Sequence, residues 1–104
     1  MSWYGNWLAA TIANGETTSA EVDLGRSMEL IQIQIPTVTS CTLKAQVAEG
    51  PGGTYRDLGE SVTTPTTTGA YSDIWNLGGY QFIKIVSSGA QGAERLIRVR
   101  GMRF

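Results

Sequence analysis

The feature that most constrains the fold is a period-two alternation of apolar and polar residues that recurs along the chain. Residues 30–36 read Leu-Ile-Gln-Ile-Gln-Ile-Pro, so the three isoleucines share one face of a strand and the two glutamines share the other. We expect Pro36 to close this strand, because proline cannot donate a hydrogen bond to a neighbouring strand. The alternation recurs in residues 42–48 and 94–102. Residues 80–86 are apolar on both faces, which predicts a central strand.

Turn signals separate these segments every 8–12 residues or so, a spacing typical of all-β domains. Asn14-Gly15 is a strong hairpin signal, and the polar, glycine-rich residues 49–53 predict a second tight turn. Gly25 and Gly78-Gly79 are expected to end strands in the same way. The sequence therefore predicts an all-β fold, a single β-sandwich or jelly-roll-like domain of about eight short antiparallel strands.

We divide the chain into an N-terminal aromatic arm with the first strand (residues 1–13) and the β-sandwich domain (residues 14–104). A chain of 104 residues forms one core without further staples. Cys41 is the single cysteine, so it cannot form an internal disulfide, and we expect an inert residue that is buried or half-buried.

The composition excludes several classes of chemistry. The chain has no histidine, which rules out Ser-His-Asp and Cys-His nucleophilic sites and nearly all transition-metal sites. A net charge of −1 is no general reason to bind nucleic acid. No apolar run approaches the ~18–20 residues that span a bilayer. We expect a soluble chain made in a cytosol, which binds neither nucleic acid nor membrane, has no cofactor and is not an enzyme.

Two acidic residues form the closest pair of carboxylates on one strand face, Glu21 and Asp23. A glycosidase needs two carboxyl groups across a cleft, with the pKa of one of them raised by its surroundings. Alternating acids on the outer face of a strand are usually solvated, so we assign this pair no catalytic role.

The last ten residues are basic. They contain four arginines and no acid, whereas the other 94 residues carry four basic and nine acidic side chains, a net charge of −5. Arg98 and Arg100 share one face of the predicted last strand. Such a face either keeps an edge strand soluble or binds an acidic protein surface, and the pattern does not separate the two.

Three aromatic residues lie within the first seven positions, Trp3, Tyr4 and Trp7. They either cover one end of the sandwich or anchor the chain on a neighbouring subunit, and we favour the second because tryptophan and tyrosine dominate interface hot spots. A third interpretation is a sugar-stacking platform, for which Tyr71 and Trp75 are equally suited. The candidate protein-interface residues are Trp3, Tyr4, Trp7, Arg95, Arg98, Arg100 and Arg103.

Several segments occur in an order that is similar to a known group of proteins. The segments are Asn14-Gly15-Glu16-Thr17-Thr18-Ser19, Asp23-Leu24-Gly25, Ile31 to Pro36, Gly52-Gly53-Thr54-Tyr55, Asp57-Leu58, Tyr80 to Val86, Ser88 to Ala93 and Arg95 to Val99. Their order resembles that of small β-sandwich structural proteins of tailed bacteriophages, over about residues 14–100.

The resemblance implies a virion component without enzymatic activity, assembled in the host cytoplasm. Within that group it implies a cement (decoration) protein on the outer surface of the head, with the major capsid protein as partner and a homo-oligomer, most often a trimer, as the bound form. The alternative is a tail- or fibre-associated module that binds host-surface carbohydrate through Trp3, Trp7, Tyr71 or Trp75.

Overall fold

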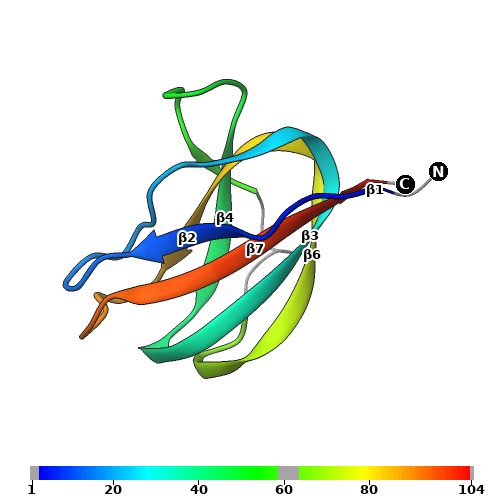
Figure 1. The fold of residues 1–104 in the computed structure, drawn as a ribbon. Helices are drawn as coiled ribbons and strands as arrows, with labels where there is room; N and C mark the ends of the chain where they lie inside the picture. The colour runs from blue at the N-terminus through cyan, green and yellow to red at the C-terminus, as the bar shows by residue number, and fades with distance from the viewer. Residues whose placement is uncertain (1–2, 59–63, 104) are drawn as a thin grey trace.

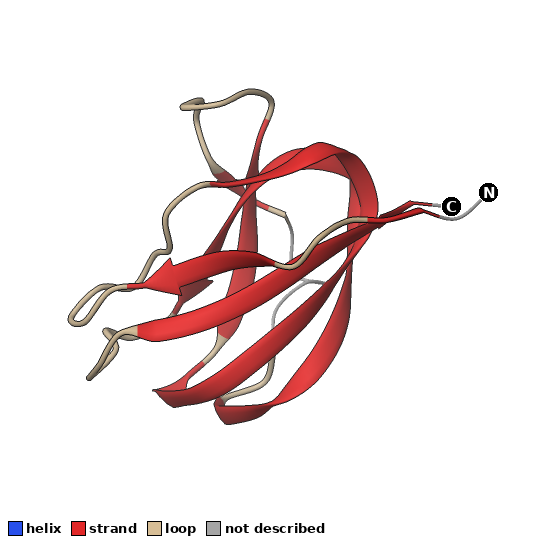
Figure 2. Ribbon diagram, viewed as in Figure 1, coloured by secondary structure: helices blue, strands red, loops and turns tan. Residues whose placement is uncertain are grey.

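The structure, a computed structural model, describes residues 3–58 and 64–103. These residues form seven β-strands and no helix (Figures 1 and 2). They therefore contain no helix that could cross a membrane. The strands are β1 (Trp3–Tyr4), β2 (Leu8–Ile12), β3 (Val22–Cys41), β4 (Leu43–Ala48), β5 (Arg56–Asp57), β6 (Thr67–Ser87) and β7 (Arg95–Arg103).

Two packed layers arise from one continuous antiparallel sheet of strand order β1-β7-β3-β6-β4-β5, with β2 also paired to β7. In the first, residues 30–34 of β3 lie between residues 72–76 of β6 and residues 98–102 of β7. We call this the β7 layer, and β1 and β2 complete it. In the second, the β4 layer, residues 82–87 of β6 pair with residues 43–48 of β4, which also pairs with β5. The predicted β-sandwich is confirmed.

The two long strands, β3 with 20 residues and β6 with 21, pass from one layer to the other. Both bend at glycines with positive φ, at Gly25 (+87°) in β3 and at Gly78 (+67°) and Gly79 (+107°) in β6. A carboxylate oxygen of Asp23 accepts hydrogen bonds from the Gly25 amide (2.8 Å) and from Gln81 Nε2 (2.9 Å), which ties the two bends together. The glycines were expected to end strands. They instead act as bulges, because an irregular residue turns a strand without ending its pairing.

Pro36 was also expected to close a strand, yet β3 continues to Cys41. The pairing explains why. Strand β7 pairs with β3 over residues 30–34, and beyond them β6 is the neighbour of β3 among the strands of residues 3–58 and 64–103. On the β6 side the pairing continues after the proline, at Thr37 with Gly69 and at Cys41 with Thr67, so Pro36 does not end the strand.

The apolar half of each alternation forms the core. Ile31, Ile33 and Ile35 are 0%, 0% and 3% exposed, as the sequence predicts. The predicted inward positions of β4 and β7 and the single cysteine are buried as well; these are Leu43, Ala45, Val47, Ile97, Val99 and Cys41. The predicted central position of residues 80–86 is confirmed, because β6 lies between β3 and β4.

At Gly69 the backbone of β3 leaves no room for a side chain on β6. The φ of Gly69 is +83°, and a Cβ atom there would lie 1.9 Å from the Pro36 carbonyl oxygen. We expect Gly69→Ala to lower the free energy of unfolding by roughly 3 kcal/mol or more, measured by urea denaturation. Gly25→Ala is the matched control, because Gly25 has a similar φ of +87° and open space around it. Its loss should be only about 1–2 kcal/mol, and equal losses would contradict the close approach.

Candidate interaction surface

The N-terminal arm and the last strand lie side by side. Strand β1 pairs with the end of β7, Trp3 with Arg103 and Tyr4 with Met102. Strand β2 pairs with the preceding part of β7, and the Gly5 amide donates a hydrogen bond of 2.9 Å to the Gly101 carbonyl. The aromatic arm and the basic strand, which the sequence presents as separate candidates, therefore belong to one surface.

Four of the predicted interface residues form an Arg–aromatic cluster, Tyr4, Trp7, Arg98 and Arg100. The guanidinium carbons of Arg98 and Arg100 lie 5.3 and 5.1 Å from the centroid of the Trp7 ring, and that of Arg100 lies 5.2 Å from Tyr4. These are cation–π distances. Arg100 Nε also donates a hydrogen bond of 2.8 Å to Gln32. No carboxylate among the described residues forms an ion pair with either arginine, so both charges remain uncompensated.

The cluster lies on the outer face of the β7 layer. The register puts Gln32 between Arg100 and Ile74, and Gln34 between Arg98 and Ser72, on the side of the sheet away from the core. We call this surface the outer β7 face, and it comprises Tyr4, Trp7, Gln32, Gln34, Ser72, Ile74, Leu96, Arg98 and Arg100.

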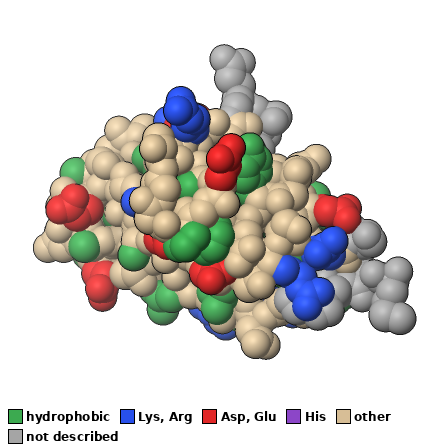
Figure 3. Space-filling model, turned by 90° about the horizontal axis from the view of Figure 1, so that it is seen from above, with side chains coloured by type: hydrophobic (Ala, Val, Ile, Leu, Met, Phe, Trp, Pro, Cys, Tyr) green, Lys and Arg blue, Asp and Glu red, His purple; other side chains and the backbone are tan. Residues whose placement is uncertain are grey.

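This face exposes large apolar side chains between its polar ones. Tyr4, Ile74 and Leu96 are 51%, 57% and 55% exposed. A shallow groove of about 230 Å³ runs between Trp7 and Ile74, over the side chains of Gln32 and Gln34. Figure 3 shows the molecule from above, where acidic, basic and apolar side chains are intermixed. Arg98 and Arg100 lie beside the half-buried Trp7 ring, and Arg100 also lies beside the exposed Tyr4 ring; arginine and aromatic side chains are both enriched at protein interfaces in general.

The other predicted interface residues lie outside the cluster. Arg95 is held internally by hydrogen bonds from its guanidinium to Gln91 (3.3 Å) and Thr39 (3.2 Å). Arg103 is at the opposite end of β7 from Arg95 and is paired with Trp3. Of Trp3 only this backbone pairing is described, and its side chain lies outside the described part.

The tryptophan considered as a sugar platform is buried. Trp75 is 6% exposed and pairs with Ile31 on the inward side of the sheet. Its indole Nε1 donates a hydrogen bond of 3.1 Å to Asp73. Tyr71 is half-buried and packs against the core. The interpretation of Trp75 as an exposed stacking ring is therefore wrong, because its side chain is part of the core.

The two acidic residues Glu21 and Asp23 have structural roles. The Glu21 carboxylate accepts hydrogen bonds from the Tyr55 hydroxyl (2.6 Å) and the Gly52 amide (2.8 Å), which lower the pKa of Glu21. Hydrogen bonds from Gln81 and Gly25 likewise lower the pKa of Asp23. A glycosidase acid needs a raised pKa, so the environment works in the opposite direction. Glu21 instead holds the hairpin of residues 49–55 in place. No sequence signal predicts its hydrogen bond with Tyr55.

No protein-family model and no curated protein matches the sequence. The fold is similar to that of the SPBc2 prophage-derived protein YomS, with a TM-score of 0.68 and 10% identity over 99% of this chain and 96% of that one. It is also similar to chitosan-binding module 1 of a chitosanase/glucanase from Paenibacillus sp. IK-5, with a TM-score of 0.59 and 15% identity over 94% of this chain and 76% of that one.

A third similar structure is CpGH89CBM32-4 from Clostridium perfringens, in complex with glcNAc-alpha-1,4-galactose. Its TM-score is 0.51 at 10% identity, over 99% of this chain and 89% of that one. At such identities the likeness concerns the fold alone. The chain thus shares its β fold with a phage-derived protein and with carbohydrate-binding modules.

The two arginines of the cluster should differ in their contribution to stability. Arg100 contacts two rings and one amide, whereas Arg98 contacts one ring. We expect Arg100→Ala to lower the free energy of unfolding by about 1–2 kcal/mol and Arg98→Ala by less than about 1 kcal/mol, in urea titrations. A larger loss for Arg98→Ala would contradict the geometry of the cluster.

The hydrogen bonds to Glu21 should make the stability depend on pH. The pKa of Glu21 is lower in the folded chain than its ordinary value of 4.5, so the ionised carboxylate stabilises the fold at neutral pH. This stabilisation is lost as the pH falls through the folded-state pKa. We expect Glu21→Gln to lower the urea midpoint at neutral pH, and the difference from the unsubstituted protein to shrink below pH 4.5. Glu16→Gln, which removes an exposed carboxylate without a described hydrogen bond, is the control and should show no such trend.

Proposed function

We propose that this chain is a non-enzymatic phage virion protein, specifically a cement protein that binds the outer capsid surface through its outer β7 face. The observation that carries the proposal is the gathering of Tyr4, Trp7, Arg98 and Arg100 on one side of one sheet. The fold likeness to YomS supports the phage assignment, since it extends over nearly the whole of both chains. The order of the sequence segments, which resembles phage structural proteins, supports it independently.

The partner of this face is an acidic surface of the major capsid protein. Arginine forks bind carboxylates in two-pronged hydrogen bonds, and the adjacent rings exclude water from such pairs. The basic last strand on an otherwise acidic chain also makes the molecule electrically asymmetric, which orients it toward a negative surface before contact. Weak single contacts suffice, because a trimer placed over the joints between capsid subunits engages several sites at once.

A second candidate function is binding of host-surface carbohydrate from a tail or fibre. The fold likeness to the chitosan-binding module and to CpGH89CBM32-4 favours it. The rings first considered for it are poorly placed, since Trp75 is buried and Trp7 lies against Arg98 and Arg100. The capsid assignment therefore accounts for more of the observed surface.

The location of the protein in the virion separates these two functions. A cryo-EM reconstruction of the phage that carries this chain should show copies on every capsomer of the head. Copies restricted to a vertex or to the tail would contradict the assignment as a cement protein.

Charge reversal tests the contact surface directly. We expect Arg98→Glu to weaken binding to capsids stripped of this protein by about tenfold or more, because a buried carboxylate partner would then face a like charge. Binding of the unsubstituted protein should also weaken as salt is raised. Co-sedimentation with capsids measures both effects. Arg56→Glu makes the same charge change on an exposed residue of β5 in the β4 layer and should bind normally. Unchanged binding of Arg98→Glu would remove this face from the contact.

A further inference from the structure

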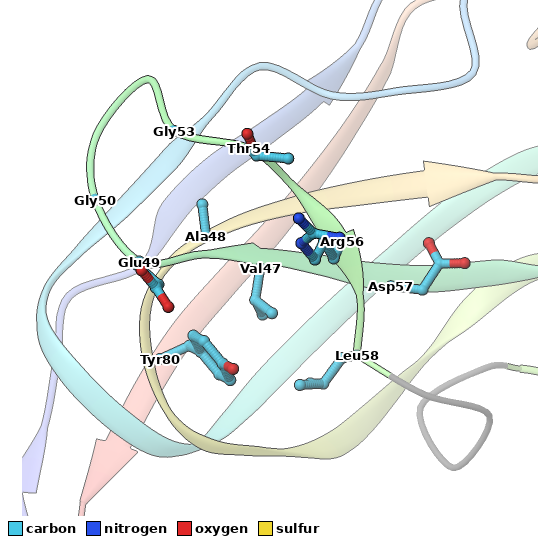
Figure 4. A pocket seen from close by; sticks show the side chains of 10 residues that line it. All are labelled: Val47, Ala48, Glu49, Gly50, Gly53, Thr54, Arg56, Asp57, Leu58 and Tyr80. Atoms are coloured by element: carbon cyan, nitrogen blue, oxygen red, sulfur yellow. The ribbon is translucent and has the colours of Figure 1, made fainter.

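A second candidate site lies away from the outer β7 face and shares no residue with it. It is a pocket of about 640 Å³ between the hairpin of residues 49–55, strand β5 and the bend of β6 (Figure 4). Val47 and Leu58 form its apolar floor, and Ala48, Glu49, Arg56 and Tyr80 also line it. We call it the hairpin pocket. Its volume is in the range of small-molecule sites.

The hairpin pocket presents an aromatic ring next to an apolar floor. Tyr80 is 37% exposed, although Val47 and Ala48 beside it are 6% and 4% exposed. Its position follows from the backbone, since Tyr80 comes directly after the bend at Gly78 and Gly79. In Figure 4 the side chains of Tyr80, Val47 and Leu58 point toward the same space. A ring that is half open to solvent above apolar side chains offers a stacking surface.

The polar groups of the pocket are free to bind a ligand. Among the described residues, the carboxylate of Glu49, the guanidinium of Arg56 and the hydroxyl of Tyr80 have no hydrogen-bond or ion-pair partner. They supply an acceptor, a forked donor and a group that does both. Asp57 also lines the pocket, but its carboxylate is paired with Lys44. The two unpaired charges, Glu49 and Arg56, are therefore opposite and disfavour a ligand with a net charge of either sign. Their combination with a ring suits a neutral molecule that has hydroxyl groups along its edge and an apolar face.

Both walls of the pocket are held in place before any ligand arrives. Glu21 binds the Gly52 amide and the Tyr55 hydroxyl, and Lys84 Nζ lies 4.5 Å from the centre of the Tyr55 ring. On β5, Asp57 forms an ion pair with Lys44 at 2.9 Å, and Gln46 donates to its carboxylate at 3.0 Å. A wall that is already ordered loses little conformational entropy on binding.

We propose that the hairpin pocket binds one pyranose unit of a neutral glycan. The Tyr80 ring stacks on the apolar face of the sugar, and Glu49 and Arg56 hydrogen-bond to its hydroxyl groups. The inference rests on neither capsid binding nor the outer β7 face.

The test uses the full chain, labelled with ¹⁵N, and three neutral probes: D-glucose, D-galactose and N-acetyl-D-glucosamine at millimolar concentrations. We expect at least one of them to give saturable shifts of amide resonances from residues 47–58 and Tyr80. Tyr80→Ala and Arg56→Ala should each raise the dissociation constant about tenfold or more, and Tyr80→Phe should retain most of the affinity because it keeps the ring.

The matched control is Trp7→Ala, which removes a ring from the outer β7 face and should leave sugar binding unchanged. Spectra of the variants should otherwise match those of the unsubstituted protein, which shows that the fold is retained. Absence of saturable shifts with all three sugars would overturn the proposal, as would shifts confined to the outer β7 face or full affinity in Tyr80→Ala. None of these results bears on capsid binding, which is measured at Arg98.

Discussion

The pairing of β3 with β6 is the interaction on which the rest of the structure depends. These two strands contribute to both layers, and every other strand is attached to one of them directly or through β4 or β7. The two strands stay paired where they pass from one layer to the other because glycines with positive φ form the bends. Asp23 links the bends by accepting hydrogen bonds from Gly25 and Gln81. The same bends place Tyr80 at the hairpin pocket. The bent pairing of β3 with β6 therefore forms the core and also positions one of the two candidate sites.

Much of the fold follows from the period-two pattern, because that pattern reports which side chains share a face. It predicts the buried isoleucines of β3 and the outward arginines of β7 correctly. It does not report whether a strand ends or bends. Gly25 and Gly78 have the signature of a turn in either case, since a turn and a bulge both favour positive φ at glycine. Strand continuity is decided by partners distant in the sequence.

The site was predictable to the same extent. The outward face of Arg98 and Arg100 follows from alternation, but their contact with Trp7 depends on the pairing of the arm with β7. Trp75 could not be assigned to the interior from its own strand, because exposure there depends on which side of the sheet the second layer covers. The hydrogen bond between Tyr55 and Glu21 joins residues 34 positions apart, so no local sequence pattern predicts it.

The Arg–aromatic cluster has consequences for binding as well as for stability. A free arginine loses substantial rotamer entropy when a partner immobilises it, whereas Arg98 and Arg100 are already restrained against the Trp7 ring. Stacking uses the face of a guanidinium and leaves its N–H edge available to a carboxylate. The arm therefore contributes to the proposed acidic contact even where it does not touch the partner, by presenting the arginines of the last strand in a fixed orientation.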